Sequence, residues 1–288
     1  MIGDRKEQNV GDGSMAAQAN GDVNITQNVG MGYSEVKDLC TMMLRENFPK
    51  LRDEAIKAAE ENVYKFSVEL EDRIVQRSND FVIDKLATPE LQAVINDSVQ
   101  AAARKGDKAN TSILVDLITE IGSSKSSDYK DLVISEAITV TPKLTGQQIS
   151  YLAFIFFTSS VVINPINDIG HVEAVSSKIW SLVNDGVAIS DSQRYHIQYT
   201  GACNILAMLS NDIYGVWYKG MCKDLAYENV DQMKEVIANK APNTDKILSA
   251  YDKDNQKGNV VLTSVGQAIA IAHLSTVLGS LDYSVWIN

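Results

Sequence analysis

The chain has 288 residues, 45% of them hydrophobic and 22% charged, and its formal net charge is −11. These values are typical of a soluble globular protein of one or two domains, and the acidic balance argues against nucleic-acid binding, which needs a basic surface. We find no run of Lys and Arg that predicts a local basic patch. The first eight residues lack the apolar segment of a secretory signal, so we expect a cytoplasmic protein.

The cysteines give no sign of a disulfide framework or a zinc site. Cys40, Cys203 and Cys222 are far apart in the sequence, and none belongs to a Cys-x-x-Cys pair. Free cysteines of this kind are usually small buried hydrophobic residues. We therefore predict reduced, mostly buried thiols.

Residues 1–32 differ from the rest of the chain. They contain three copies of a Gln-x-x-Gly pattern, which begin at Gln8, Gln18 and Gln27. Glycine at turn positions and the alternation of Val23 and Ile25 with polar residues predict short β-strands joined by tight turns. One such strand cannot bury enough apolar surface by itself, so we predict that copies from several chains stack. The residues expected to form this contact are Gln8, Gly11, Asp12, Gln18, Gly21, Asp22, Val23, Ile25, Gln27 and Gly30.

Two assemblies satisfy this pattern. The first is a closed, intertwined β-helix or β-prism, a small β-solenoid built by three or more protomers. The second is an open-ended cross-β stack with hydrogen-bonded glutamine ladders. A disordered Gly/Asn/Gln-rich tail remains the alternative, because this composition by itself permits disorder.

Several segments carry a resemblance to known sequences. The stretch from Gly11 to Gln27, together with residues 141–148 and 199–203, resembles a family of uncharacterised bacterial proteins with a short Gly-Asp/Gln repeat before a long helical region. The repeat is also similar to the amyloid-type signalling motifs of bacterial immune receptors and their effectors. These resemblances imply self-assembly and a setting in defence against phage, and they transfer no catalytic residue.

Residues 33–87 are predicted to form one long helix or stalk. Apolar residues recur every three or four positions from Val36 to Phe81, which is helical spacing. Ser34 is the expected N-cap, Pro49 the expected site of a kink or break, and the helix is expected to continue to Leu86. The charged residues between the apolar positions, Arg73 and Arg77 among them, are interpreted as a solvated surface. The stalk either forms a seam between chains or packs on its own downstream domain.

Residues 88–288 are predicted to form an irregular multi-helix body, so the fold class is mostly α. The expected helices span residues 88–105, 110–121, 128–140, 146–163, 168–184, 192–209, 211–226, 228–240, 244–252 and 263–279. Capping boxes are expected at Thr145 with Gln148 and at Ser190 with Gln193. A short strand is expected at residues 259–262.

Two segments of the body are apolar on almost every side. These are residues 151–163 and 265–278. Thirteen helical residues span about 20 Å of a hydrocarbon layer that is about 30 Å thick, so a place in the core is favoured over membrane insertion.

The sequence shows no catalytic or cofactor motif. His171, His196 and His273 are far apart in the sequence, and no phosphate loop, dinucleotide fingerprint or hydrolase elbow is present. The segment from Asp252 to Gly258 has a weak similarity to a calcium loop, but its glycine stands one position late, and a polar turn is favoured. We therefore expect no metal and no cofactor, and an enzyme is the less favoured class.

Three functions remain open from the sequence. The first is a non-enzymatic, self-assembling homo-oligomer whose helical body acts as a recognition or effector module, with a protein partner an additional option. The second is an effector that perturbs membranes when it is clustered. The third is an enzyme whose acid and base residues leave no motif in the sequence.

Overall fold

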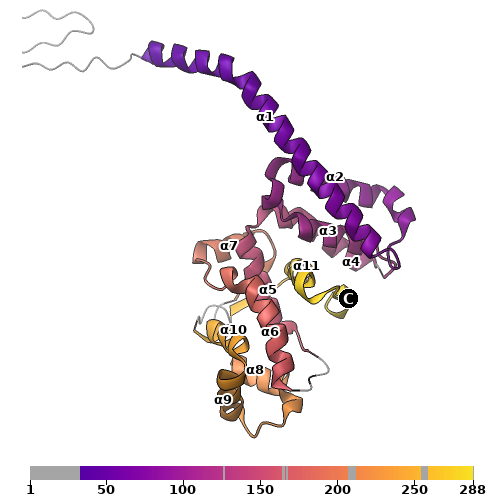
Figure 1. The fold of residues 1–288 in the computed structure, drawn as a ribbon, viewed down its shortest axis with the longest axis vertical. Coiled ribbons are helices and arrows are strands. Elements are labelled where there is room, and N and C mark those ends of the chain that lie inside the picture. Colours follow the sequence, from indigo (N-terminus) through magenta and orange to yellow (C-terminus); the bar gives the residue numbers. More distant parts are fainter. Residues whose placement is uncertain are drawn as a thin grey trace, which may run out of the picture. The chain divides into compact units, whose positions relative to one another are not determined.

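The fold is mostly α-helical, as predicted. The structure is a computed structural model that describes residues 33–125, 127–163, 166, 168–206, 212–253 and 259–287 (Figure 1). The predicted β-forming repeat, residues 1–32, lies outside the described residues. The chain divides into two units between Asp53 and Glu54, inside the first helix. The second unit, from Glu54 onward, contains the end of the first helix and every later element.

The α-helices are α1 (Tyr33–Gln76), α2 (Pro89–Lys105), α3 (Thr111–Ile121), α4 (Asp128–Val140), α5 (Gly146–Ser160), α6 (Ile169–Val183), α7 (Asp191–Tyr199), α8 (Ile213–Lys219), α9 (Val230–Lys240), α10 (Pro242–Asp252) and α11 (Ser264–Leu278). Short 3₁₀ turns are η1 (Ile83–Ala87), η2 (Gly106–Ala109), η3 (Thr141–Lys143), η4 (Asn184–Gly186), η5 (Lys223–Leu225) and η7 (Tyr283–Val285). Strands β1 (Cys203–Ile205) and β2 (Val260–Leu262) pair antiparallel.

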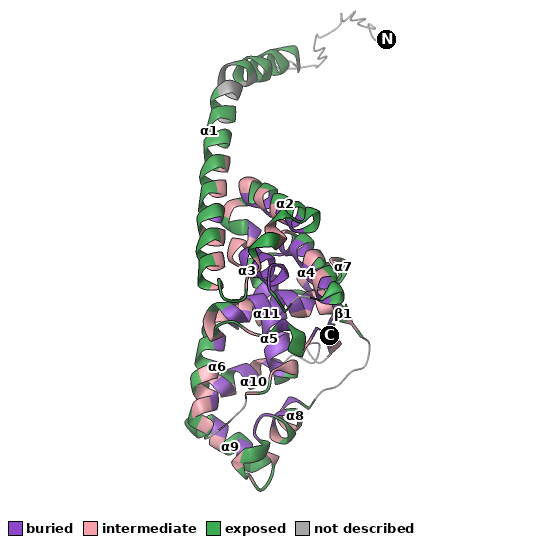
Figure 2. Cartoon of the chain, turned by 90° about the vertical axis from the view of Figure 1, so that its right-hand side faces the viewer, coloured by how far each residue is buried: buried purple, intermediate pink, exposed green. Residues whose placement is uncertain are grey.

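Helices α5 and α11 form the centre of the core. They pack against each other, and α11 also contacts α3, α4 and α6 (Figure 2). Residues 151–157 of α5 and 268–272 of α11 are fully buried or nearly so. The prediction that both apolar segments belong to the core is therefore confirmed. None of the described helices combines the length and apolarity needed to cross a membrane.

Side-chain caps fix the ends of several helices. Both predicted capping boxes, at Thr145 and at Ser190, are present. The side-chain amide of Gln148 also donates to the backbone carbonyl of Gln193 over 2.9 Å. This bond joins the starts of α5 and α7. Helix α10 has no side-chain cap of its own, and the carboxylate of Glu173 in α6 accepts its first free amides instead.

The predicted helix 192–209 is wrong in its second half. Helix α7 ends at Tyr199, because Gly201 adopts a φ of +83°, which a right-handed helix cannot continue. Residues 203–205 then pair with 260–262, and Cys203 lies opposite Leu262. The partner strand is the one that the sequence predicts at residues 259–262.

Helix α1 begins at Tyr33, so Ser34, the predicted N-cap, lies in its first turn. Position 49, where a kink or break was predicted, lies within this one helix. The helix ends at Gln76, so the prediction that it continues to Leu86 is wrong by ten residues. Residues after Gln76 turn away and pair with the end of α3: Phe81 bridges Ser123, and the amide of Val82 donates to the carbonyl of Gly122 over 2.9 Å. This pairing satisfies backbone groups that a longer helix would bond internally.

Candidate functional site: the apolar face of helix α1

One face of α1 is covered by the body over only part of its length. Phe66 is 1% exposed, and Leu70 and Ile74 line a space of about 270 Å³ with Ile95 and Val99 of α2. Helix α2 ends at Lys105, and the Asn62 side chain donates to the carbonyl of Ala103, close to that end. The cover that α2 provides therefore stops near Asn62.

The same face of α1 continues toward the N-terminus of the helix. There no other described element of the second unit packs on it. Ile56, Ala59 and Val63 follow the spacing of three and four residues that leads to Phe66 and Leu70. With Glu60, Tyr64 and Ser67 they line a shallow, mostly apolar groove of about 530 Å³. Ile56 is 47% exposed and Tyr64 is 71% exposed. We call these six residues the α1 face.

The part of α1 in the first unit also carries exposed apolar side chains. These are Val36, Leu39, Met42 and Met43. A contiguous exposed apolar surface is typical of a binding surface, whereas single exposed apolar residues are ordinary. The α1 face is therefore the candidate functional site of the described residues.

A buried charge network attaches the end of α1 to the body. The carboxylate of Glu120 in α3 accepts one bond from Arg77, at 2.7 Å, and one from Lys130 in α4, at 2.9 Å. The side chains of Glu120 and Lys130 are only 3% and 1% exposed. Arg77 is mostly buried as well, so the interpretation of this residue as part of a solvated surface is wrong.

A second carboxylate extends the network one helical turn away. Asp116 accepts a hydrogen bond of 2.8 Å from the hydroxyl of Tyr283, and it lies 3.6 Å from the guanidinium of Arg73. Burial raises the pKa of Asp116, although Tyr283 and Arg73 oppose that shift. Burial also raises the pKa of the Tyr283 phenol well above its ordinary value, so the hydroxyl keeps its proton and remains a donor.

These convergent carboxylates do not form a site accessible to a substrate. Asp116 and Glu120 are each 3% exposed, and every bond described above joins them to another protein group. A general acid or base must reach its substrate. The arrangement therefore supports a structural role, in which the network fixes α1 on α3 and α4, and it gives no support to the enzyme hypothesis.

The other chemistry-bearing residues are scattered. The described residues contain no cluster of three or more His, Cys, Asp or Glu side chains that suits a metal ion. Cys203 and Cys222 are buried, as predicted, and burial raises their pKa values to about 12 and about 11, whereas Cys40 is exposed. Most of the segment with calcium-loop similarity, residues 254–258, lies outside the described residues, as do all ten predicted assembly residues of the repeat.

The burial of His273 is expected to make the free energy of unfolding depend on pH. Burial lowers its pKa from 6.5 to about 4, so the folded protein holds it neutral while the unfolded chain binds a proton below pH 6.5. The unfolded state is then favoured as pH falls from 6.5 toward 4, and the free energy of unfolding should drop by about 2 kcal/mol at pH 5. Urea unfolding of His273→Gln at pH 7 and pH 5 should show less of this loss, whereas His171→Gln should keep it. An equal loss in His273→Gln and the wild type would contradict the assignment.

Two features of the site were missed in the sequence. The apolar positions of α1 are visible as a stripe, but its covered and uncovered parts look alike because their difference depends on where α2 ends. The charge network had a local signal: Asp116 and Glu120 stand four residues apart in an apolar segment, and Arg73 and Arg77 have the same spacing. Ionisable residues rarely occupy buried positions without a partner.

Fold and site together define a mostly α-helical protein whose long first helix presents an uncovered apolar face. The model of an uncharacterised bacterial protein family matches residues 30–228 and residues 216–287, and since it covers more than half of the chain, the protein belongs to that family. The match starts at residue 30, after most of the repeat. No curated protein and no solved structure matches the chain.

Proposed function

We propose that this protein is a non-enzymatic, self-assembling protein of the bacterial cytoplasm. In this proposal, the repeat of residues 1–32 brings chains together, and the α1 face provides a second contact between them. The observation that supports it is the apolar face of α1, which continues beyond the end of α2 without cover in the second unit. The helical body then acts as a recognition or effector module.

A second copy of the chain is the partner that suits the α1 face best. Two copies present the same surface, so a two-fold arrangement pairs each apolar position with another apolar position. Glu60 belongs to the face, and Lys57, Glu61 and Lys65 are near it in the sequence, so both signs of charge are available for pairing across an antiparallel contact. A weak helix contact and a weak repeat contact on one chain strengthen each other through avidity.

The biological setting follows from the resemblance of the repeat to immune signalling motifs. Defence against phage is the setting that we propose, with clustering as the event that activates the body. The alternative of a membrane-perturbing effector would require α5 or α11 to leave the core, where both are buried. The packing therefore favours assembly over membrane insertion.

The α1 face can be tested with two neighbouring alanines. Ala59 lines the groove, whereas Ala58 is exposed and lies about 100° further round the helix. Ala59→Glu places a charge in the proposed contact and should reduce the assembly mass measured by light scattering, with at least a tenfold weaker association. Ala58→Glu, with the same change in charge, should assemble like the wild type.

The contribution of the repeat is tested separately by removing residues 1–32. The truncated protein should keep its helical circular dichroism and lose assembly mass. Combining the truncation with Ala59→Glu should produce a monomer. An unchanged assembly mass after both changes would refute the proposal, because neither contact would then carry the assembly.

A further inference from the structure

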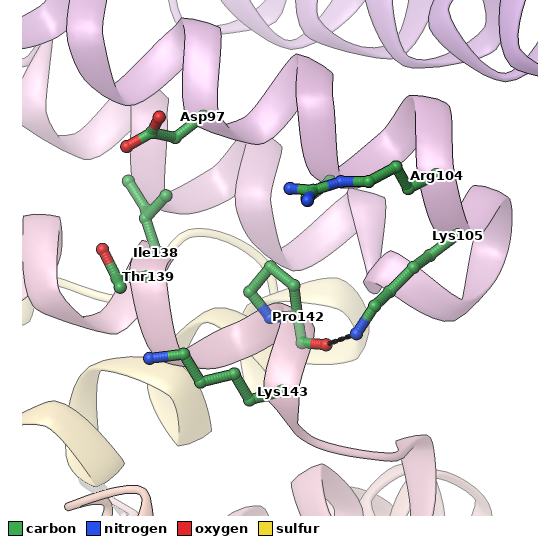
Figure 3. A pocket seen from close by; sticks show the side chains of 8 residues that line it. Asp97, Arg104, Lys105, Ile138, Thr139, Pro142 and Lys143 are labelled. Carbon is green, nitrogen blue, oxygen red and sulfur yellow. Dashed lines mark hydrogen bonds between the residues drawn. The ribbon is translucent and has the colours of Figure 1, made fainter.

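A basic groove on the body shares no lining residue with the α1 face. It lies between the end of α2 and the connection from α4 to α5, and it consists of two adjoining spaces of about 340 and 900 Å³. Figure 3 shows the residues that line the smaller space. The two spaces share Arg104, Lys105, Pro142 and Lys143. Volumes in this range are typical of small-molecule sites.

The charge of the groove is opposite to that of the protein. Four cations line it, from Arg104, Lys105, Lys108 and Lys143, against the two carboxylates of Asp97 and Asp107. The whole chain has a net charge of −11. This basic patch is not evident in the sequence because Lys143 is distant from the other cations, although the run from Arg104 to Lys108 holds three of the four.

Several donor groups of these cations remain available to an anion. Lys105 donates to the carbonyl of Pro142, which holds the two sides of the groove together (Figure 3). Arg104 uses its Nε on the carbonyl of Gln100. Within the ranges that the structure describes, the ammonium groups of Lys108 and Lys143 form no ion pair and donate no hydrogen bond. Clustered cations repel one another, and an anion bound among them would relieve that repulsion.

The first residue of α5 lines the larger space, so the partial positive charge at the start of this helix faces the groove. This residue is Gly146, and a side chain added at this position would meet nothing within 4 Å. The first amides of a helix point outward and favour a negative ligand. The groove is therefore open at these amides.

The smaller space has a different character. Ala101, Ile138 and Pro142 give it an apolar surface, and Asp97 and Thr139 place an acceptor and a hydroxyl beside that surface (Figure 3). A planar, uncharged group with a hydrogen-bond donor suits this end. The phosphate oxygens of the same molecule would then reach Lys108 in the larger space, with Arg104 and Lys143, which line both spaces, beside them.

We propose that this groove binds an organic phosphate of nucleotide size, with its phosphates among Arg104, Lys108 and Lys143 and its planar group against Ile138 and Pro142. Charge-assisted hydrogen bonds from Lys and Arg are the strongest contacts that such a ligand can receive. The site is separate from the α1 face, so this proposal does not depend on the proposed function.

The test uses the full chain and isothermal titration calorimetry with ATP, and with inorganic pyrophosphate as a second probe. ATP should bind with a dissociation constant below 1 mM, a threshold typical of weak specific ligands. Lys108→Ala and Lys143→Ala should each weaken binding by roughly tenfold, which corresponds to one charge-assisted contact. Pyrophosphate should bind more weakly than ATP, because it leaves the apolar end empty.

Two matched variants separate this site from general attraction to positive charge. Lys223→Ala and Lys240→Ala remove exposed lysines elsewhere on the body and should leave ATP binding unchanged. Thr139→Ala, which removes an exposed hydroxyl from the smaller space, should weaken ATP but not pyrophosphate. Failure of both probes to bind the wild type, or equal losses in the Lys143 and Lys240 variants, would overturn the proposal.

Discussion

Replacing Glu120 with glutamine should lower the free energy of unfolding by about 3–5 kcal/mol, the usual cost of removing one partner from a buried ion pair. The change keeps the shape of the side chain but removes the carboxylate that lies 2.9 Å from the ammonium group of Lys130, and the side chain of Lys130 is 1% exposed. Lys130 would keep only neutral acceptors, the carbonyl of Lys125 and the amide oxygen of the new glutamine, and it would lose the carboxylate that balances its buried charge. Urea unfolding followed by circular dichroism measures the loss.

Two further variants identify the cause of that loss. Glu136→Gln makes the same change on the exposed surface of α4 and should alter the free energy of unfolding by less than about 0.5 kcal/mol. The double variant Glu120→Gln with Lys130→Met removes the unpaired cation and should recover part of the stability. If the double variant is as unstable as the sum of its single changes, the two charges do not act as a pair.

Gly266→Ala should destabilise the protein by about 3 kcal/mol, a large value for the insertion of one methyl group. The added Cβ would lie 1.9 Å from the carbonyl oxygen of Ala202, which belongs to the backbone and accepts a hydrogen bond from Thr263. Relief of the clash requires α11, the central helix of the core, to move away from the start of β1. Thermal unfolding should show a clear decrease in Tm.

Gly146→Ala is the matched control for that substitution. Gly146 also lies in the first turn of a core helix, but a Cβ there meets no atom within 4 Å. We expect its effect on the free energy of unfolding to stay within about 0.5 kcal/mol. A similar loss of stability in both variants would show that the close approach to Ala202 is not the cause.

Much of the fold could be predicted because its signals are local. Thr88 with Pro89 and the two capping boxes mark helix starts through side chains three residues apart, and the structure places α2, α5 and α7 there. The ends were harder to predict. The end of α1 depends on pairing with residues 122–124, and the end of α7 on the strand partner at 260–262. Such non-local contacts leave no periodic signal in the segment that they terminate.

The candidate site could be predicted only in part, for the same reason. The apolar stripe of α1 is visible in the sequence, but its exposure at Ile56 depends on the length of α2. The basic groove combines Lys143 with cations some forty positions earlier, and the packing of α2 on α4 and the hydrogen bonds from Asn110 to the carbonyls of Thr141 and Leu144 bring the two segments together. Only the fold places these groups side by side.

The central position of α11 also affects how the protein is made. Helices α3, α4, α5 and α6 all pack against α11, yet the ribosome synthesises α11 after each of them. Until α11 emerges, the nascent chain exposes the apolar surface that this helix later covers, and domains usually fold as units during synthesis. Ribosome-bound chains that stop before residue 264 should therefore be sensitive to protease and should bind chaperones, whereas chains in which α11 has left the exit tunnel should be resistant.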